Sequence, residues 1–423
     1  MIATLAILPV ALLALGTPVF LVFLAAVAAT FVFVLPTPPV AMHQVLFGGL
    51  DNYALLAIPF FVFAGELMGT SGIATRLIVW VLALVGRVPG SLAISTVGAS
   101  TVIGAISGSS VAAVAALGKT LYPKLESAGY GRERSAGLLA SSGAIDIVIP
   151  PSIAMILYGL AAEQSIPRLF MAGVLPGLLI AALMCIYVFI VAVRLKIPVV
   201  GRFDASEAWL ATKNAFAALL MPVFVLGGIY NGWFSPTEAG GFACLYAIIV
   251  ARYVYGTMGW ADIVRAAGNA AMLSAQILII VATAGLVTWV LTTQGVPQTI
   301  VAALDALQMN DWTFLLAVNL VLLVVGCFLD PTSAILVLAP LLVPIAISLG
   351  IDPIHFGIIM TVNLAIGMFT PPFGLNIFVA QSVTGLPAHA LYRGVMPFVA
   401  VQVTALAIIT YVPALSLVLG KSL

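Results

Sequence analysis

Long runs of apolar residues, separated by short polar stretches, recur from one end of the sequence to the other. Many runs approach the roughly 20 residues that an α-helix needs to cross about 30 Å of hydrocarbon. A membrane-spanning barrel would instead show alternating segments of roughly ten residues, and that pattern is absent. The predicted helices are 2–15, 17–35, 54–70, 92–118, 136–162, 170–193, 214–230, 237–255, 268–293, 313–349, 356–382 and 395–419. The pattern therefore predicts an all-α polytopic membrane protein.

Two of these apolar segments are interrupted at their centres. Segment 92–118 contains Ser107-Gly-Ser-Ser110, and segment 313–349, which is also too long for one comfortable span, contains Asp330-Pro-Thr-Ser333. A chain that enters the membrane to about half its depth and then returns explains both interruptions. Each segment is therefore predicted to be a re-entrant helical hairpin.

The composition excludes a water-soluble protein. Of the 423 residues, 63% are hydrophobic and 7% are charged, whereas a soluble domain carries roughly 25% charged residues. The net charge of +1, without a dense cluster of Lys and Arg, argues against nucleic-acid binding. The three cysteines, Cys185, Cys244 and Cys327, lie in apolar segments and are predicted to pack in the interior. Residues 1–35 lack a basic start and are predicted to be retained as helix rather than cleaved as a signal peptide.

The distribution of basic residues predicts the orientation, because Lys and Arg gather on the cytoplasmic side of membrane proteins. Basic residues flank the first interrupted segment, whereas acidic residues flank the second, so the two hairpins are predicted to enter from opposite faces. The basic residues assigned to the cytoplasm are Arg76, Arg87, Lys119, Lys124, Arg132, Arg134, Arg194, Lys196, Arg202, Lys213, Arg252 and Arg265. The acidic residues assigned to the outside are Asp305, Asp311 and Asp352. Arg168 and Lys421 fall on the outer side and count against the assignment.

An internal repeat supports this orientation. Gly104–Ser110 aligns with Gly326–Thr332 at an offset of 222, Pro150-Pro151 with Pro371-Pro372 at 221, and Ala64-Gly65 with Ala284-Gly285 at 220. Together with the opposed hairpins, this near-constant offset predicts an inverted-topology repeat of the kind common in secondary transporters. The predicted division is 1–53 (scaffold), 54–168 (first half), 169–265 (scaffold and cytoplasmic connections), 266–393 (second half) and 394–423 (C-terminal scaffold helix).

Each half also contains a helix that a double proline interrupts, within 136–162 and within 356–382. Proline removes a hydrogen-bond donor and clashes with the carbonyl four residues earlier, so two in succession unwind a helix. Carbonyls freed in this way cannot face lipid, so they are predicted to line a polar cavity or to bind a ligand. Unwound carbonyls suit Na⁺, and helix N-termini with hydroxyl groups suit an anion. The alternative is a proline kink with small residues that allow close helix packing.

A few polar residues within or beside the apolar segments invite a functional interpretation. Asp330 lies at the centre of the second hairpin, where a charge is costly, and Asp146 precedes the first proline pair. Either acid is a candidate for ion or substrate binding, and either could instead cap a helix. Glu66 and Glu238 are predicted to be structural, hydrogen-bonded near helix ends. The three histidines, His43, His355 and His389, fall in predicted loops and are expected to be solvated.

Several of these motifs resemble the large membrane subunit of tripartite ATP-independent periplasmic (TRAP) transporters over nearly the whole chain. They are Gly104–Ser110, Ser141-Ser-Gly143 leading to Ile149-Pro-Pro-Ser152, Pro236-Thr-Glu-Ala239, and Asn363 leading to Thr370-Pro-Pro-Phe-Gly374. Two positions depart from the family pattern: Ser235 stands where the family usually has Thr, and Asp146 where a small or apolar residue is expected.

The resemblance implies a Na⁺-driven uptake system in a bacterial or archaeal cytoplasmic (inner) membrane, with no cofactor besides the coupling ion. It implies two partners, a small four-helix membrane subunit and a soluble periplasmic substrate-binding protein, and an elevator movement of the hairpin-bearing domain. Substrates of the family are mostly small organic acids, such as C4-dicarboxylates and sialic acids. The chain starts almost at the first helix of the large subunit, so no fused small subunit is expected.

The resemblance also implies two Na⁺ sites and one substrate site between the hairpin tips. The predicted Na⁺ ligands are Gly108, Ser110, Ser142, Gly143, Asp146 and Pro150 in the first half, and Gly326, Ser333, Gly367, Thr370 and Pro371 in the second. The predicted substrate ligands are Ser107, Ser109, Ser152, Asp330 and Thr332. Because no Arg lies within the apolar spans to meet a carboxylate, the anion is expected to be held by hydroxyls, backbone amides and helix N-termini.

Two other classes of function were weighed against transport. An intramembrane zinc protease would need His-Glu-x-x-His, and this motif is absent. A Ser–His hydrolase would need a histidine at membrane depth, whereas the three histidines fall in predicted loops. A channel with re-entrant loops remains an alternative, and it would conduct ions without saturable substrate flux. ATP-driven transport by this chain is excluded because no G-x-x-x-x-G-K-[ST] motif is present.

Overall fold

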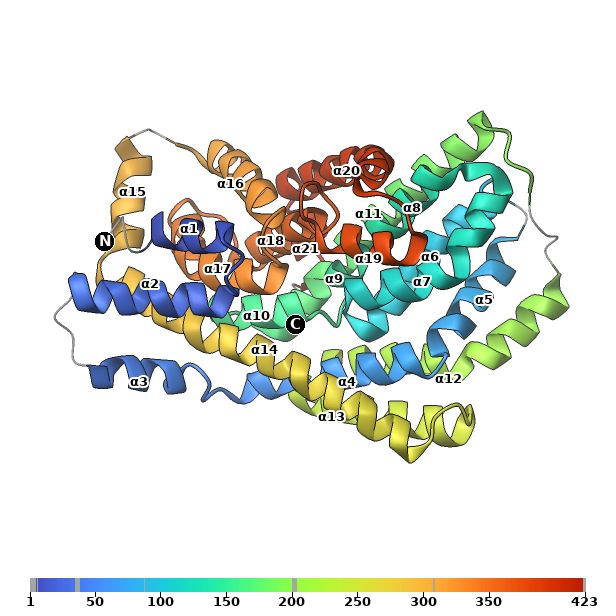
Figure 1. Ribbon diagram of the computed structural model, residues 1–423, viewed down its shortest axis with the longest axis horizontal. Coiled ribbons are helices and arrows are strands. Elements are labelled where there is room, and N and C mark those ends of the chain that lie inside the picture. The colour runs from blue at the N-terminus through green and yellow to red at the C-terminus, as the bar shows by residue number, and fades with distance from the viewer. Residues whose placement is uncertain are drawn as a thin grey trace.

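The computed structural model describes residue 5 and residues 7–34, 39–86, 88–199, 204–306 and 309–420, and these residues form helices without a strand. Seven helices are long and apolar enough to cross a membrane, or up to eight if a bent pair counts as one span, within the described ranges. The chain begins with α1 (Leu8–Ala14), α2 (Val19–Phe33), α3 (Pro39–Gly48), η2 (Tyr53–Leu56), α4 (Ala57–Thr70) and α5 (Ile73–Val85) (Figure 1). The chain is thus an all-α polytopic membrane protein, as predicted.

The first interrupted segment forms a helical hairpin of α6 (Ser91–Ser107) and α7 (Ser110–Leu125), followed by η3 (Glu126–Tyr130). Helix α6 ends at Ser107, and its C-cap is Gly108, whose positive φ of 57° favours glycine. The hydroxyl of Ser109 then accepts a hydrogen bond from the backbone of Ala112 and caps α7. A left-handed glycine followed by a helix-capping serine therefore makes the tight turn at the hairpin tip.

The double prolines break both of the helices in which they occur. The first is divided into α8 (Arg132–Ser142), α9 (Ile145–Val148) and α10 (Ile153–Ala161), with a bend of 45° between α9 and α10. The second is divided into α18 (Pro353–Gly367) and α19 (Leu375–Thr384). The Pro150-Pro151 and Pro371-Pro372 peptide bonds are both cis. The prediction of broken helices at both sites is confirmed.

Long helices connect and surround these elements. They are α11 (Ile166–Arg194), α12 (Ala205–Tyr230), α13 (Pro236–Ile249) with the π-helical turn η4 (Val250–Val254), α14 (Trp260–Thr293), α15 (Val296–Ala306), α16 (Asp311–Gly326), α17 (Pro331–Ser348), α20 (Ala388–Tyr411) and α21 (Ala414–Leu417). Ser235 and Glu238 form a reciprocal capping box at the start of α13. This contact confirms the structural role predicted for Glu238.

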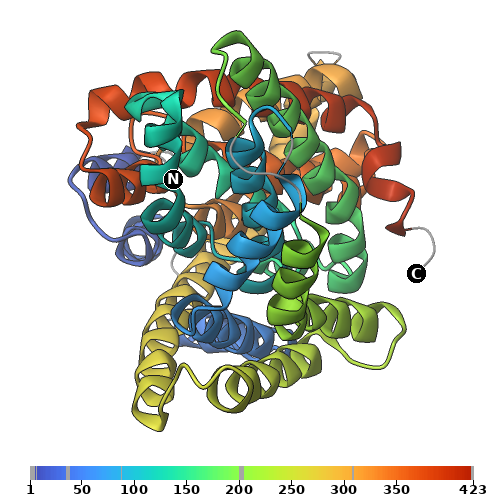
Figure 2. The same ribbon diagram turned by 90° about the vertical axis from the view of Figure 1, so that its right-hand side faces the viewer.

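The two hairpins approach each other from opposite ends of the molecule. In Figure 1, α6 and α7 lie toward the right-hand end, with the C-terminus of α11 and the N-terminus of α12, whereas α16 and α17 lie to the left, next to α15. The helix after each double proline crosses to the other half: α10 packs on α17, and α19 packs on α7. Figure 2, seen from the right-hand end of Figure 1, shows α5 between the first hairpin and α12, and α5 packs on both.

Several sequence-based expectations need correction. Helices α3, α5 and α15 were not predicted, because proline, glycine or arginine interrupts the apolar pattern in each region. His355 is not solvated: Pro353 starts α18, and the imidazole two residues later is 2% exposed, with Nε2 3.2 Å from the carbonyl oxygen of Thr410. The three cysteines are free thiols; Cys244 is buried as expected, whereas Cys185 and Cys327 are only partly buried. Predictions for residues 1–4, 6 and 35 and for Arg87, Arg202 and Lys421 fall outside the described residues, as does the side chain of Asp305.

Candidate functional site

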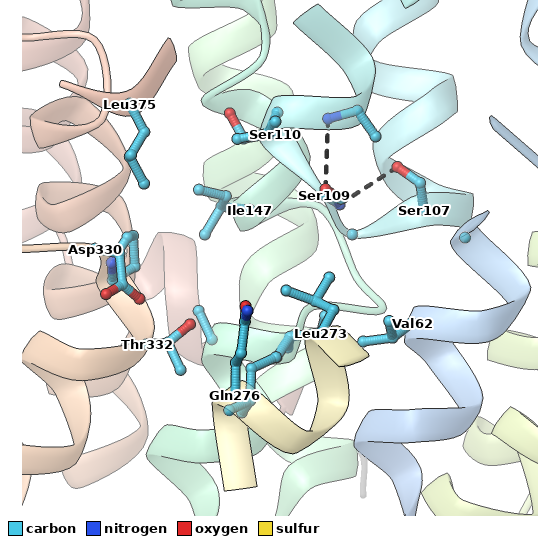
Figure 3. Close-up of a pocket in the computed structure, with 18 of the residues that line it drawn as sticks. Val62, Ser107, Ser109, Ser110, Ile147, Leu273, Gln276, Asp330, Thr332 and Leu375 are labelled. Carbon is cyan, nitrogen blue, oxygen red and sulfur yellow. Dashed lines mark hydrogen bonds between the residues drawn. The ribbon is translucent and has the colours of Figure 1, made fainter. Parts of the chain in front are cut away.

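All four interruptions of the backbone meet around one cavity of about 390 Å³ at the centre of the molecule. The first hairpin tip lines it with Ser107 to Ser110, and the second with Asp330 to Thr332. Ile147, Ile153 and Ala154 beside the first double proline, and Met368 and Leu375 beside the second, complete these walls. In Figure 3, Asp330 and Thr332 lie on one side of the cavity, and Ser107, Ser109 and Ser110 lie on the other.

The first tip rests directly on the first break. An added Cβ at Gly108 would lie 2.9 Å from the carbonyl oxygen of Pro151, and one at Gly143 would lie 2.9 Å from the carbonyl oxygen of Ser110. Within the tip, the backbone N–H of Ser109 donates to the hydroxyl of Ser107 at 3.3 Å. Glycine is therefore required on both sides of this contact, because any larger residue would separate the hairpin from the break.

Carbonyls at the first break were predicted to line a polar cavity or to bind a ligand. Several of them instead lie within hydrogen-bond distance of buried side chains. Asn376 of α19 donates to the carbonyl of Ala140 at 3.0 Å, and Gln402 of α20 donates to that of Ser141 at 2.9 Å. The hydroxyl of Ser100 lies 2.8 Å from the carbonyl oxygen of Ser142. The carbonyls of Ala140 and Ser141 are therefore satisfied by buried donors from neighbouring helices, whereas the single proton of the Ser100 hydroxyl is shared between the Ser142 carbonyl and the carboxylate of Asp146.

Asn376 was missed by the sequence analysis. Its side-chain Nδ2 donates to the hydroxyl of Ser110 at 2.6 Å, and the same hydroxyl lies 2.9 Å from Asn376 Oδ1. The side chain is fully buried, so it ties the second half of the chain to the first hairpin. A single amide at the start of a short apolar helix carries no sequence signal for this role.

Two buried oxygen atoms behind the first tip have no hydrogen-bond partner: the hydroxyl of Ser142 and Oδ2 of Asp146. The other carboxylate oxygen of Asp146 lies 2.8 Å from the hydroxyl of Ser100. Asp146 is fully buried and packs against Gly104, where an added Cβ would lie 2.6 Å from its Cα. Buried polar atoms are rarely left unpaired, so these oxygens are candidates for ligand contacts.

The second tip is capped by Asp330. The carboxylate accepts from the backbone N–H of Ser333 at 3.2 Å and also accepts from its hydroxyl. The residue still lines the cavity, so capping and exposure to a ligand coexist. Behind this tip, an added Cβ at Gly367 would lie 2.4 Å from the carbonyl carbon of Gly326. The second hairpin therefore contacts its break through two glycines.

Helices α4 and α14 supply polar groups that the sequence analysis did not assign to the site. Glu66 lines the cavity and accepts from Asn269 Nδ2 at 2.9 Å. Gln276, two turns further along α14, also faces the cavity (Figure 3). Glu66 is thus hydrogen-bonded, as expected, but it belongs to the cavity wall. No Lys, Arg or His is among the described residues that line the cavity.

The predicted site residues divide into two groups. Those that line the cavity are Ser107, Gly108, Ser109, Ser110, Asp330 and Thr332. Those outside its lining are Ser142, Gly143, Asp146, Pro150, Ser152, Gly326, Ser333, Gly367, Thr370 and Pro371. Ser152 is 1% exposed, and its hydroxyl caps α10 at Met155.

The fold and its cavity define a class of protein. Broken helices and paired hairpins that meet around one central cavity are the architecture of a membrane transporter. The solved structure of the YdaH transporter from Alcanivorax borkumensis has a similar fold, with a TM-score of 0.58 over 88% of this chain and 87% of that chain, at 14% sequence identity.

Sequence comparison identifies the family. The family model described as tripartite ATP-independent periplasmic transporter, DctM component, matches residues 6–415. The chain is 44% identical to the C4-dicarboxylate TRAP transporter large permease protein DctM of Pseudomonas aeruginosa, over 88% of each chain. It is 35% identical to the protein of the same name from Rhodobacter capsulatus, over 98% of this chain and 97% of that one. The chain belongs to the family of TRAP transporter large membrane subunits, which are permeases and not enzymes.

Proposed function

We propose that this chain takes up a small organic acid across the cytoplasmic membrane of a bacterium or archaeon, coupled to Na⁺. It works with a small four-helix membrane subunit and with a periplasmic binding protein that delivers the substrate, as the family implies. The relatives named above are C4-dicarboxylate transporters, so a C4-dicarboxylate is the first substrate to test. A sialic-acid-like acid is the second.

The observation that carries the proposal is the charge of the central cavity. Its lining contains two acidic residues, Glu66 and Asp330, and no basic side chain among the described residues. Among the described residues, the charged side chains that an anionic substrate would meet there are all negative, at short range and partly shielded from water. Bound cations would offset this repulsion, and uptake of an anion through this site would then require them.

The unpaired oxygens support a cation site behind the first tip. The hydroxyl of Ser142 and Oδ2 of Asp146 are oxygen ligands of the kind that hard cations prefer, and the hydroxyl and carbonyl of Ser110 pack against the neighbouring Gly143. The equivalent position in the second half is the contact between Gly326 and Gly367. We assign the two Na⁺ ions to these two contacts between a hairpin tip and a break.

The substrate is assigned to the space between the tips. The N-caps of α7 and α17, Ser109 and Asp330, both lie there, and a helix N-terminus attracts negative charge. The hydroxyls of Ser107, Ser109 and Thr332 add hydrogen-bond donors, while Asn269 and Gln276 add side-chain amides from α14.

An elevator movement is part of the proposal. The first hairpin tip contacts α4 at Gly65, where an added Cβ would lie 2.9 Å from the carbonyl oxygen of Ser107. A glycine at this contact leaves a smooth surface along which the tip could slide. The movement would expose the cavity alternately to the two faces of the membrane.

The test is uptake by the complete complex in proteoliposomes. Radiolabelled succinate, and in a parallel series N-acetylneuraminate, would be supplied on the binding protein with Na⁺ or K⁺ outside. The proposal requires saturable uptake of at least one acid that an inward Na⁺ gradient drives and that K⁺ does not support. Uptake of either acid that ignores the Na⁺ gradient would refute the coupling. Ion current without saturable uptake would favour a channel.

A further inference from the structure

A second cavity, of about 520 Å³, lies away from the substrate site and shares none of its lining residues. It is an open pocket that is bordered by the first turns of α5, by α12 and by the end of the π-helical turn η4. Its polar lining consists of Thr75, Arg76, Lys213, Asn214 and Tyr255. Helix α5 packs on α12 beside the cavity, and Trp80 Nε1 donates to the hydroxyl of Thr212 at 3.0 Å across this contact.

The cavity is positively charged. Arg76 and Lys213 line it, and no Asp or Glu is among its described lining residues. Neither base takes part in the ion pairs found in the described part of the chain, which are Arg132–Glu126 and Arg265–Asp262. The cavity therefore presents two cations whose charge no neighbouring carboxylate neutralises.

The arginine is held in place rather than free to extend into solvent. Its guanidinium carbon lies 4.0 Å from the centroid of the Tyr255 ring, in a cation–π contact. The Tyr255 hydroxyl donates in turn to the carbonyl oxygen of Asn214 at 3.0 Å. Such a fixed, planar guanidinium with free N–H groups is suited to two-point contact with a phosphate.

The start of α5 adds a third source of positive potential. Its N-cap is Gly72, with a φ of 75° and no side chain to satisfy the N–H groups of the first turn. Gly72 lines the cavity, as do Thr75 and Arg76 of the following turn. Uncapped N–H groups and the helix dipole attract an anion, and this helix start lines the same cavity as the two cations.

The residues around this cavity have the charge and the adjoining apolar surface that an anionic phospholipid requires. Arg76, Lys213 and the nearby Arg252 belong to the group of basic residues that the positive-inside pattern assigns to the cytoplasmic side. Two further lining residues, Val79 and Val254, are 50% and 57% exposed, so apolar surface adjoins the polar cavity. Basic pockets between membrane helices on the cytoplasmic side bind anionic head groups.

We propose that this cavity binds a phosphate group, supplied by the head group of an anionic phospholipid of the cytoplasmic leaflet. The phosphate contacts Arg76, Lys213 and the first turn of α5, and the acyl chains lie along Val79 and Val254. The lipid thereby joins the corner between α4 and α5 to α12 and η4. The site is independent of substrate and Na⁺ binding.

The test uses the complete complex, purified in detergent and depleted of lipid. Phosphatidylglycerol, phosphatidylcholine and inorganic phosphate are titrated separately, and binding is followed by native mass spectrometry and by the thermal unfolding midpoint. Phosphatidylglycerol should bind and raise the midpoint, whereas phosphatidylcholine should do so far less. The double variant Arg76→Gln/Lys213→Gln should weaken phosphatidylglycerol binding by roughly thirtyfold, since each basic residue contributes about a fivefold factor near an anionic surface.

A control variant outside the cavity and a single variant within it separate loss of lipid binding from loss of folding. Lys124→Gln removes an exposed cytoplasmic lysine outside the cavity and should leave phosphatidylglycerol binding unchanged. If the double variant fails to fold, the single variant Lys213→Gln, at an exposed position, should still weaken binding about fivefold. Equal phosphatidylglycerol affinity in the wild type and in the Lys213→Gln variant would overturn the proposal. Stabilisation by inorganic phosphate, but not by phosphatidylglycerol, would overturn the lipid as the source.

Discussion

Replacing Gly367 by alanine tests the contact between the second hairpin and its break. The added Cβ would lie 2.4–2.5 Å from the carbonyl carbon, Cα and oxygen of Gly326, all of them backbone atoms. Ordinary contacts between such atoms are roughly 3.5–4.0 Å. The hairpin tip must therefore move away from the break by roughly 1 Å, because no flexible side chain can yield in its place.

The energetic cost follows from this displacement. Overpacking a close-packed interior costs about 1–3 kcal/mol. If Na⁺ binds only when the tip rests on the break, this energy is lost from ion binding, which corresponds to a roughly five- to 150-fold weaker apparent Na⁺ affinity. The same exchange at Gly326 should have a smaller effect, because there the added Cβ would lie 3.2 Å from the nearest atom, the Cα of Gly367.

The assay is Na⁺-dependent succinate uptake by the reconstituted complex, over a series of external Na⁺ concentrations. Gly285→Ala is the matched control, since an added Cβ on that helical glycine meets nothing within 4 Å. The half-saturating Na⁺ concentration should increase in the order Gly285→Ala, Gly326→Ala, Gly367→Ala. A Gly367→Ala complex that assembles and keeps the wild-type Na⁺ dependence would refute the assignment of an ion site to this contact.

Three further predictions address other parts of the site. Asp330→Asn retains a helix-capping side chain but removes the charge, so Na⁺-driven uptake should fall while the thermal unfolding midpoint of the complex stays nearly unchanged; wild-type uptake would contradict a role for this charge. Asn376→Ala leaves the Ala140 carbonyl and the Ser110 hydroxyl without this partner and should lower the free energy of unfolding by about 1–3 kcal/mol, measured by denaturant titration of the detergent-solubilised complex. Ser109→Cys and Thr332→Cys lie in the lining of the same cavity, so both should react with a membrane-impermeant maleimide from the cytoplasm in the inward-facing state and from outside in the outward-facing state; labelling from the same face in both locked states would contradict the alternating exposure of the cavity.

The sequence was sufficient to predict the interrupted elements, because their signals are local. A left-handed glycine beside a capping serine, and two prolines in succession, dictate backbone conformation without help from distant residues. The offset between the two halves then relates these local signals to each other. With the family resemblance, these signals assigned Ser107, Ser109, Asp330 and Thr332 to one substrate site, and these four residues line one cavity.

Features that depend on distant packing could not be predicted. The hydrogen bonds of Asn376 and Gln402 join residues more than 200 positions apart, and nothing near either amide indicates its partner. Asn269 and Gln276 lie on a helix without any interruption, so only the fold reveals that they face the cavity. His355 was misplaced because the apolar pattern placed the start of this helix at residue 356, whereas Pro353 begins α18.

The crossing of α10 and α19 has a consequence for how such a protein could arise. Because α10 packs on α17 and α19 packs on α7, each half closes the other's hairpin and neither encloses a ligand alone. If the two halves form the predicted inverted repeat, an ancestor the size of one half could have built a complete site by pairing with a second copy inserted in the opposite orientation. Fusion of two such genes would have fixed that antiparallel partnership in a single polypeptide, after which each copy was free to diverge.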